Sequence, residues 1–172
     1  INARAADPNA DLFYNDYNIE NGDAKTDHML SLVDGLIARG VPISGVGFQM
    51  HVLSSWPSIN TIESVMRAVA DRGLKVKISE LDVRVNNQYD PSAPVYHSLT
   101  AEAAATQKAR YQQIVAAYKR AVPPAQRAGI TVWGVWDDNS WLNTPEHPDW
   151  PLLFDGNFNA KPALQGFADG LR

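Results

Sequence analysis

The chain has 172 residues, of which 45% are apolar and 20% charged, enough for one globular domain with a substantial core. Its 15 basic and 19 acidic side chains give a net charge of −4, which argues against a surface that binds nucleic acid or an anionic membrane. No apolar run has the length of a membrane span, and the absence of cysteine excludes a disulfide framework and a thiolate site.

The first third of the chain alternates predicted strands and helices. Residues 1–8 resemble the end of a helix, so we expect the natural polypeptide to continue upstream. An apolar, aromatic strand is predicted over 10–16. A helix is predicted over 25–39, where apolar residues recur at helical spacing before Gly40 ends it. A second apolar strand is predicted over 43–50.

The same alternation continues through the middle of the chain. Asn60 is predicted to cap the next helix, with Glu63 as its capping-box partner and Gly73 at the helix end. Residues 74–83 form the third predicted strand. The polar connection over 86–99 is long for a compact domain, and such loops are usually functional or mobile.

Four strand–helix units are complete by the C-terminal end. Thr100 is predicted to cap a long helix that runs to about Val122, and 130–136 is the fourth strand. The last helix is predicted to begin at Pro162, since proline is favoured in a first turn. The alternation with apolar strands predicts an α/β fold with a parallel sheet buried on both faces. The length fits a small open α/β domain or half of a (β/α)8 barrel, which typically needs about 250 residues.

Polar and aromatic residues follow all four predicted strands. They are residues 14–18, residues 49–51, residues 80–82, and Trp133 and Trp136 with Asp137 and Asp138. In barrels the active site lies at the C-terminal ends of the strands. Residues at these four strand ends therefore predict a site, and they favour the half barrel over the open domain.

Two carboxylates on one strand are the strongest chemical signal. Glu80 and Asp82 lie two residues apart, so their side chains share a face of the strand. Two carboxylates so close repel each other, which raises the pKa of one of them unless a third group intervenes. His51 on the neighbouring strand could be that group, by hydrogen-bonding one or both carboxylates. Alone, Glu80 could equally belong to a structural ion pair. Gln49 is predicted either to close a loop or to bind substrate.

Five tryptophans and six tyrosines are distributed unevenly along the chain. Trp133 and Trp141 flank the loop after the fourth strand, and Tyr17 follows the first strand. Flat aromatic faces suit the C–H faces of sugar rings, so we predict ligand contacts for Trp133 and Trp141. Trp56 and Trp150 are predicted to pack in the core.

Four motifs resemble glycoside hydrolase family 10 in order and spacing. They are Phe13-Tyr14-Asn15-Asp16-Tyr17-Asn18, Gly47-Phe48-Gln49-Met50-His51, Ile78-Ser79-Glu80-Leu81-Asp82 and Thr131-Val132-Trp133-Gly134-Val135. The resemblance covers nearly the whole chain and is closest to the Cellvibrio and Pseudomonas type, through residues 2–8 and 149–154. It implies a retaining endo-β-1,4-xylanase on a (β/α)8 barrel, of which this chain would be the C-terminal half, strands five to eight with their helices.

The resemblance also implies a role for each matching position. Glu80 matches the nucleophile that forms the glycosyl-enzyme. His51 and Asp82 match the groups that hydrogen-bond around the nucleophile and keep it ionised, and Gln49 matches the same polar cluster. Trp133 and Trp141 match the aromatic walls of the subsites on the non-reducing side. Tyr17 matches an aromatic residue that stacks on a sugar further along, and Asn18 a neighbouring polar contact.

The chain departs from the family pattern in three places. It lacks the segment that carries the acid/base glutamate in strand four, so a complementary N-terminal half-barrel chain is the expected partner and the chain alone is expected to be inactive. Some relatives bind calcium after the nucleophile strand, but here only Asn87 and Asp90 match that loop, and no cofactor or catalytic metal is expected. Relatives usually have a smaller or polar residue in place of Trp136. Xylan as substrate implies secretion.

Three other functions stay open on the sequence alone. A non-catalytic fragment could bind xylan through the aromatic side chains of Trp133, Trp141 and Tyr17. A barrel metalloenzyme could use His51, Glu80 and Asp82 as ligands, although a single histidine is few for zinc. Another retaining β-glycanase would share the same pair of carboxyl roles.

Overall fold

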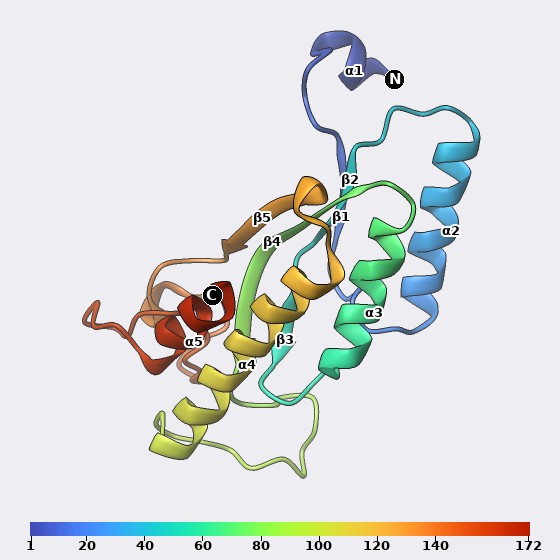
Figure 1. The fold of residues 1–172 in the computed structure, drawn as a ribbon. Coiled ribbons are helices and arrows are strands. Elements are labelled where there is room, and N and C mark those ends of the chain that lie inside the picture. The colour runs from blue at the N-terminus through green and yellow to red at the C-terminus, as the bar shows by residue number, and fades with distance from the viewer.

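The computed structural model describes all residues, 1–172, as a curved parallel sheet with the main helices packed along it (Figure 1). The strands are β1 (Phe13–Asp16), β2 (Gly45–Phe48), β3 (His51–Leu53), β4 (Lys75–Arg84) and β5 (Arg127–Val132). The helices are α1 (Asn2–Ala6), α2 (Ala24–Ala38), α3 (Ile59–Ala70), α4 (Ala101–Ala121) and α5 (Pro162–Leu171), with short 3-10 turns η1 (Pro124–Gln126) and η2 (Asp137–Asn139).

The sheet has the topology of half a barrel. β1 pairs with β2, β2 and β3 both pair with β4, and β4 pairs with β5, always in parallel. β2 and β3 follow one another along β4 and so fill one strand position between them. The strand positions therefore lie in chain order, and β1 and β5 each pair on one side only. The predicted half barrel is confirmed, and helices do not cover both faces as in an open α/β domain.

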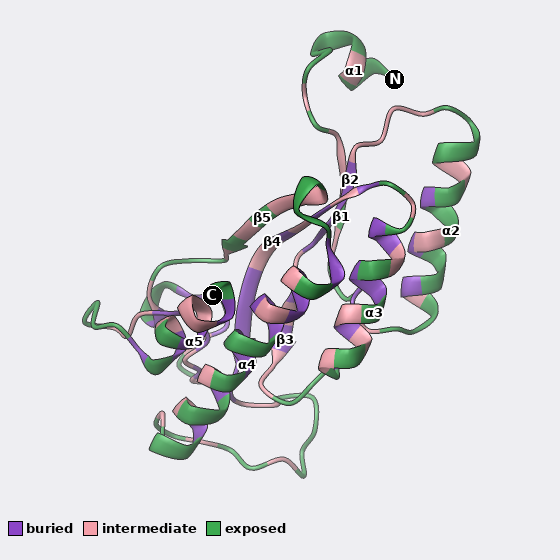
Figure 2. Ribbon diagram, in the orientation of Figure 1, coloured by how far each residue is buried: buried purple, intermediate pink, exposed green.

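The core lies between β4 and the helices that pack along it (Figure 2). Val76 and Ile78 of β4 are completely buried, as are Tyr111 and Ile114 of α4. The hydroxyl of Tyr118 donates to the carbonyl oxygen of Val76 at 2.9 Å, which fastens α4 to β4 by a polar contact as well. These contacts fix the strand that carries the predicted carboxylates. No helix combines the length and apolar character that a membrane span requires.

The second predicted strand is interrupted at its C-terminal end. Met50 adopts a φ of 66°, in the left-handed region that side chains other than glycine rarely enter, and it separates β2 from β3. Pairing with β4 survives on both sides of the break, because the backbone N–H of Glu80 donates to Gln49 and that of Asp82 to Met50. The predicted strand over 43–50 did not include β3, and the apolar pattern gives no signal of this local distortion.

The predicted cap of α3 is wrong. Ser58, not Asn60, is the N-cap, and its hydroxyl oxygen accepts from the backbone N–H of Thr61. Glu63 does not close a capping box; its carboxylate pairs with Arg67 and Arg120 instead. Other helix boundaries agree with the sequence: Thr100 caps α4, Pro162 begins α5, and Gly40 follows α2.

The fourth strand begins and ends earlier than predicted. β5 starts at Arg127 and stops at Val132, so Trp133 and Trp136 lie in the connection that follows. Gly134 has a φ of 130°, which turns the chain away from the sheet. Trp136 packs against Phe158 with ring centroids 4.5 Å apart. The aromatic residue at position 136 therefore has a packing partner within the same C-terminal segment.

A buried ion pair holds this C-terminal segment in place. The Nζ atom of Lys161 lies 2.9 Å from Oδ2 of Asp137 and donates to the carbonyl oxygens of Trp150 and Leu152. Burial lowers the pKa of Lys161 and raises the pKa of Asp137, since each charge loses water that its partner only partly replaces. The pair therefore joins η2, the loop before α5 and the start of α5.

We expect Lys161→Met to lower the free energy of unfolding by about 3–5 kcal/mol, because it leaves Asp137 as an unpaired buried carboxylate. Urea denaturation of the variant and the parent measures the difference. Arg39→Met, which removes an exposed cation after α2, is the control and should change stability by no more than about 0.5 kcal/mol. Equal stabilities of the Lys161 variant and the parent would contradict the role of the ion pair.

Candidate active site

The structure brings all of the predicted site residues together around the C-terminal half of β4. Gln49 and His51 flank the break between β2 and β3, Glu80 and Asp82 lie on β4, and Tyr17 and Asn18 follow β1. Trp133 follows β5, and Trp141 follows η2. Residues from four strand positions thus meet at one place, as the strand-end pattern predicted.

His51 is the centre of the cluster. Its Nδ1 atom lies 2.9 Å from Oδ2 of Asp82, and its Nε2 atom lies 3.5 Å from Oε2 of Glu80. Burial lowers the pKa of His51, but the hydrogen bond with Asp82 and the negative charges of Asp82 and Glu80 outweigh it, so the pKa lies above its ordinary value. The imidazole is therefore biased toward the cationic form that both carboxylates stabilise.

The two tryptophans complete this arrangement. The indole Nε1–H of Trp141 donates to Oδ2 of Asp82 at 2.9 Å, and the ring of Trp141 meets His51 edge-on with centroids 5.1 Å apart. The ring of Trp133 also meets His51 edge-on, with the two ring centroids 6.5 Å apart. Both indoles are about half exposed, so each has surface left for a ligand.

The two carboxylates have different environments. Asp82 is completely buried, and its Oδ2 atom takes the hydrogen bonds from His51 and Trp141 while Oδ1 has no partner in the protein. The Glu80 side chain is 16% exposed, and its Oε1 atom accepts from Nδ2 of Asn15 at 3.3 Å. Glu80 is therefore the carboxylate that a ligand can reach, and Asp82 is the one that orients His51.

Asn15 is a site residue that the sequence did not single out. Its Oδ1 atom accepts from the hydroxyl of Ser79 at 2.6 Å, which leaves its amide nitrogen facing Glu80. The only sequence signal is its place in the polar end of the first strand. The close packing of Asn15 against Gly47 shows why a residue with no side chain stands there, because a Cβ atom would lie 2.3 Å from Oδ1 of Asn15.

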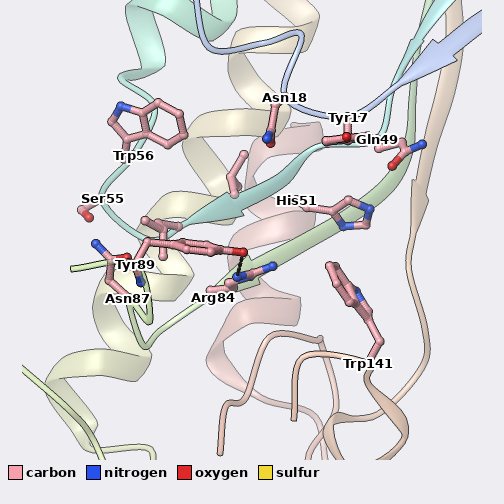
Figure 3. A pocket seen from close by; sticks show the side chains of 12 residues that line it. Tyr17, Asn18, Gln49, His51, Ser55, Trp56, Arg84, Asn87, Tyr89 and Trp141 are labelled. Atoms are coloured by element: carbon pink, nitrogen blue, oxygen red, sulfur yellow. Dashed lines mark hydrogen bonds between the residues drawn. The ribbon is translucent and has the colours of Figure 1, made fainter. Parts of the chain in front are cut away.

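A cleft of about 790 Å³ opens beside His51 (Figure 3). It is lined by Tyr17, Asn18, Gln49, His51, Val52, Leu53, Ser55, Trp56, Arg84, Asn87, Tyr89 and Trp141. Trp56, predicted to pack in the core, is instead 49% exposed on this wall. Arg84 and Tyr89 were not predicted, although Arg84 continues the alternation of Glu80 and Asp82 along β4.

Tyr17 is held by a charged neighbour. The Nζ atom of Lys25 lies 3.5 Å from the centroid of its ring and 3.0 Å from Oδ1 of Asp16. Burial raises the pKa of Asp16, but hydrogen bonds from Tyr14 and Lys25 outweigh it and leave the pKa below its ordinary value. The salt bridge and the cation–π contact together restrain the Tyr17 ring, which is still half exposed toward the cleft.

The residues considered as metal ligands are not arranged as a metal site. No group of three or more histidine, cysteine or acidic side chains in the chain is arranged so that it could hold a metal ion. Both nitrogens of His51 face carboxylates that they pair with directly. In the loop after β4, Asn87 accepts from the backbone of Tyr89 and Asp90 from Ser92, so these two side chains close local turns. Calcium needs six to eight oxygen ligands, and the loop does not fit such a site.

Glu20 is a buried carboxyl group close behind the site. It lies in the loop after β1, is completely buried, and neither carboxyl oxygen has a hydrogen-bond partner in the protein. Burial raises the pKa of Glu20 to about 7. The loop itself is fixed, because the hydroxyl of Thr26 donates to the carbonyl of Ile19 and accepts from the N–H of Gly22.

This half barrel carries its polar cluster and exposed tryptophans at the C-terminal ends of its strands, which is where the active sites of (β/α)8 enzymes lie. A family model, Glycosyl hydrolase family 10, matches residues 1–170. The chain therefore belongs to glycosyl hydrolase family 10.

Relatives and solved structures agree with this membership. Endo-1,4-beta-xylanase A of Cellvibrio japonicus is 49% identical over 98% of this chain and 29% of its own length. Native xylanase 10C of the same organism superposes with a TM-score of 0.95 at 51% identity, over 98% of this chain and 37% of that structure. A variant of that enzyme was solved with xylopentaose, with a TM-score of 0.94 at 51% identity, over 98% of this chain and 35% of that one.

This chain spans only part of each of these relatives. It covers 52% of the solved catalytic core of xylanase A, with a TM-score of 0.94 at 49% identity over 99% of this chain. A more distant relative, Exoglucanase XynX of Acetivibrio thermocellus, is 38% identical over 97% of this chain and 14% of its own length.

We expect Glu20→Gln to remove a pH dependence of stability. Folding raises the pKa of Glu20 from 4.5 to about 7. The protonated side chain therefore contributes its full share to the stability of the fold below pH 4.5, and this share is lost as the pH rises through 7. The variant should therefore be as stable as the parent at pH 4 and about 3 kcal/mol more stable at pH 8.

Urea denaturation of both proteins between pH 4 and pH 8 measures this difference. Glu102→Gln, which removes an exposed carboxylate at the start of α4, controls for the loss of one negative charge. A stability difference between the Glu20 variant and the parent that does not change with pH would contradict the assignment.

Proposed function

We propose that this chain is the C-terminal half of the catalytic barrel of a retaining endo-β-1,4-xylanase, with Glu80 as the nucleophile. The observation that carries the proposal is the accessible carboxylate of Glu80, held by Asn15 and His51 beside two exposed tryptophans. The names of the relatives and the xylopentaose complex of one of them support xylan as the substrate.

In the first step, a carboxylate oxygen of Glu80 attacks the anomeric carbon of a xylose unit. The bond from that carbon to the bridging oxygen breaks, and a general acid protonates the departing oxygen. In the second step, water attacks the same carbon and breaks the ester bond, and its proton passes to the group that had acted as the acid. Two inversions leave the anomeric configuration unchanged.

His51 and Asp82 serve Glu80 without touching the sugar. The cationic form of His51 lies 3.5 Å from Glu80, so its charge stabilises the carboxylate that is released when the ester breaks. Asp82 and Trp141 hold the imidazole in that position. Trp133 and Trp141 offer apolar faces for the sugar rings next to the nucleophile.

The general acid must come from outside this chain. A retaining site needs a second carboxyl group about 5–5.5 Å from the nucleophile. Asp82 is buried under its own hydrogen bonds, Asp16 is paired with Lys25, and Glu20 is sealed in the loop after β1. We infer that a glutamate of an N-terminal half barrel supplies this group.

The open edges of the sheet support such a partner. β1 and β5 each have one unpaired side, which a strand of the other half would complete. Leu32 and Ile37 on α2 are each 42% exposed, apolar surface that a neighbouring helix would cover. We also propose that the enzyme acts outside the cell, because its substrate is a polymer of the plant wall.

We expect the chain alone to show no hydrolysis of xylan, and a complete barrel to restore it. The complete barrel joins the N-terminal half of xylanase A from Cellvibrio japonicus to residues 1–172. Reducing ends released from xylan report activity, and thermal unfolding of both proteins shows whether each is folded. Hydrolysis by the folded chain alone would overturn the inference of a missing acid.

We expect Glu80→Gln in the complete barrel to lower kcat on the order of 10⁴-fold or more, because the amide cannot act as the nucleophile. Asp90→Asn, in a surface loop, is the control. In Glu80→Ala, added azide should attack an activated aryl xyloside from the vacated side and give the α-xylosyl azide. No second displacement follows there, so the inverted product marks position 80 as the nucleophile.

The exoglucanase relative supports one alternative, another retaining β-glycanase. Comparison of xylan and soluble cellulose as substrates of the complete barrel separates the two. Binding of xylohexaose without any turnover would instead favour a carbohydrate-binding fragment.

A further inference from the structure

Arg84 occupies a distinctive place in the cleft. It ends β4, two residues after Asp82 and four after Glu80, so the same alternation brings all three to the site. Its guanidinium carbon lies 5.3 Å from the ring centroid of Trp141 and 5.2 Å from that of Tyr89. Figure 3 shows the hydrogen bond of 3.0 Å that its Nη1 atom donates to the hydroxyl of Tyr89. The guanidinium is therefore held between two aromatic side chains.

The charge of this guanidinium has no acidic partner in the protein. None of the ion pairs of the chain includes Arg84. The nearby carboxylate of Asp149 accepts from the backbone N–H groups of Val85, Asn86 and Trp150 instead. Arg84 is only 7% exposed, so it has lost most of its water without gaining a counter-charge.

Arg84 lines the cleft and keeps donors that no group of the protein takes up. The residue lines the cavity, its one hydrogen bond uses Nη1, and none of its remaining nitrogens is sealed from solvent. No aspartate or glutamate lines the same cavity, whose other ionisable basic group is His51. Trp56 and Tyr89, 49% and 73% exposed, add flat apolar surface to the walls. The cleft thus combines a fixed cation with stacking surface.

We propose that Arg84 binds the carboxylate of an acidic sugar substituent on the xylan chain, a uronic acid branch. Unsubstituted xylose offers only hydroxyl and ether oxygens, whereas a planar guanidinium matches a carboxylate with two parallel hydrogen bonds. Trp56 or Tyr89 would stack on the ring of the branch. This assignment rests on the proposed function and names the substrate class that the same cleft accepts.

The test measures binding to the complete barrel carrying Glu80→Gln, so that ligands are not consumed. Three oligosaccharides share one xylan backbone: one unbranched, one with a single glucuronic acid branch, and one with that branch reduced to neutral glucose. We expect the acidic ligand to bind at least about 10-fold more tightly than its reduced counterpart at low salt. That preference should shrink as ionic strength rises, since salt screens the attraction.

Substitutions then assign the preference to one residue. Arg84→Gln should bring the ratio of the two affinities close to one, and Arg84→Lys should retain part of it, because the charge is kept without the planar fork. Arg39→Gln, an exposed arginine after α2, should leave the ratio unchanged. Thermal unfolding confirms that each variant is folded, and if Arg84→Gln is not, the comparison of ligands and salt in the parent decides.

Two results would overturn the proposal. One is equal affinity of the parent for the acidic and the reduced ligands at low salt. The other is an Arg84→Gln variant that weakens all three ligands alike, which makes Arg84 a support for Tyr89 and Trp141. Failure of the proposed function is a separate result, seen as no hydrolysis of unbranched xylan by the complete barrel with Glu80 intact.

Discussion

The completely buried carboxylate of Asp82 is the constraint on which the site depends. A buried charge is tolerated only when other groups take the place of water, and here His51 and the indole of Trp141 do so. Those two contacts join β3, β4 and the loop after η2 at one oxygen atom. They also leave the second nitrogen of His51 facing Glu80 and the Trp141 ring facing the cleft. One buried acid thus orients the imidazole beside the reactive carboxylate and an aromatic wall of the cleft.

A buried ion pair, Lys161 with Asp137, stabilises the segment that carries Trp141, a partner of Asp82. Trp141 belongs to a long irregular segment, which would be free to move without an anchor of its own. The pair of Lys161 and Asp137 supplies that anchor, because Lys161 also donates to two carbonyl oxygens of the same segment. The polar site therefore depends on an ion pair that is buried and does not line the cleft. The apolar packing of α4 on β4 provides the rigid base for both.

The fold could be predicted from the sequence because strand–helix alternation and polar strand ends are regular signals. The prediction that Glu80, His51 and Trp133 lie close together succeeded for the same reason. The errors arose where competing local contacts decide: Ser58 caps α3 while Glu63 is drawn to two arginines, and Gly134 ends β5 early. Asn15 and Trp56 were missed or misplaced because their roles depend on neighbours far away in the chain, which periodicity does not report.

The left-handed backbone of Met50 restricts which residues can evolve at that position. A branched side chain such as valine or isoleucine suits a buried strand elsewhere, but it is strained at a φ of 66°. Glycine would relieve the backbone, yet it would leave a cavity where the fully buried methionine packs, at a cost of roughly 2–5 kcal/mol. The accepted substitutions are therefore few and unbranched. A single backbone angle narrows the sequence space of a position that takes no part in the chemistry.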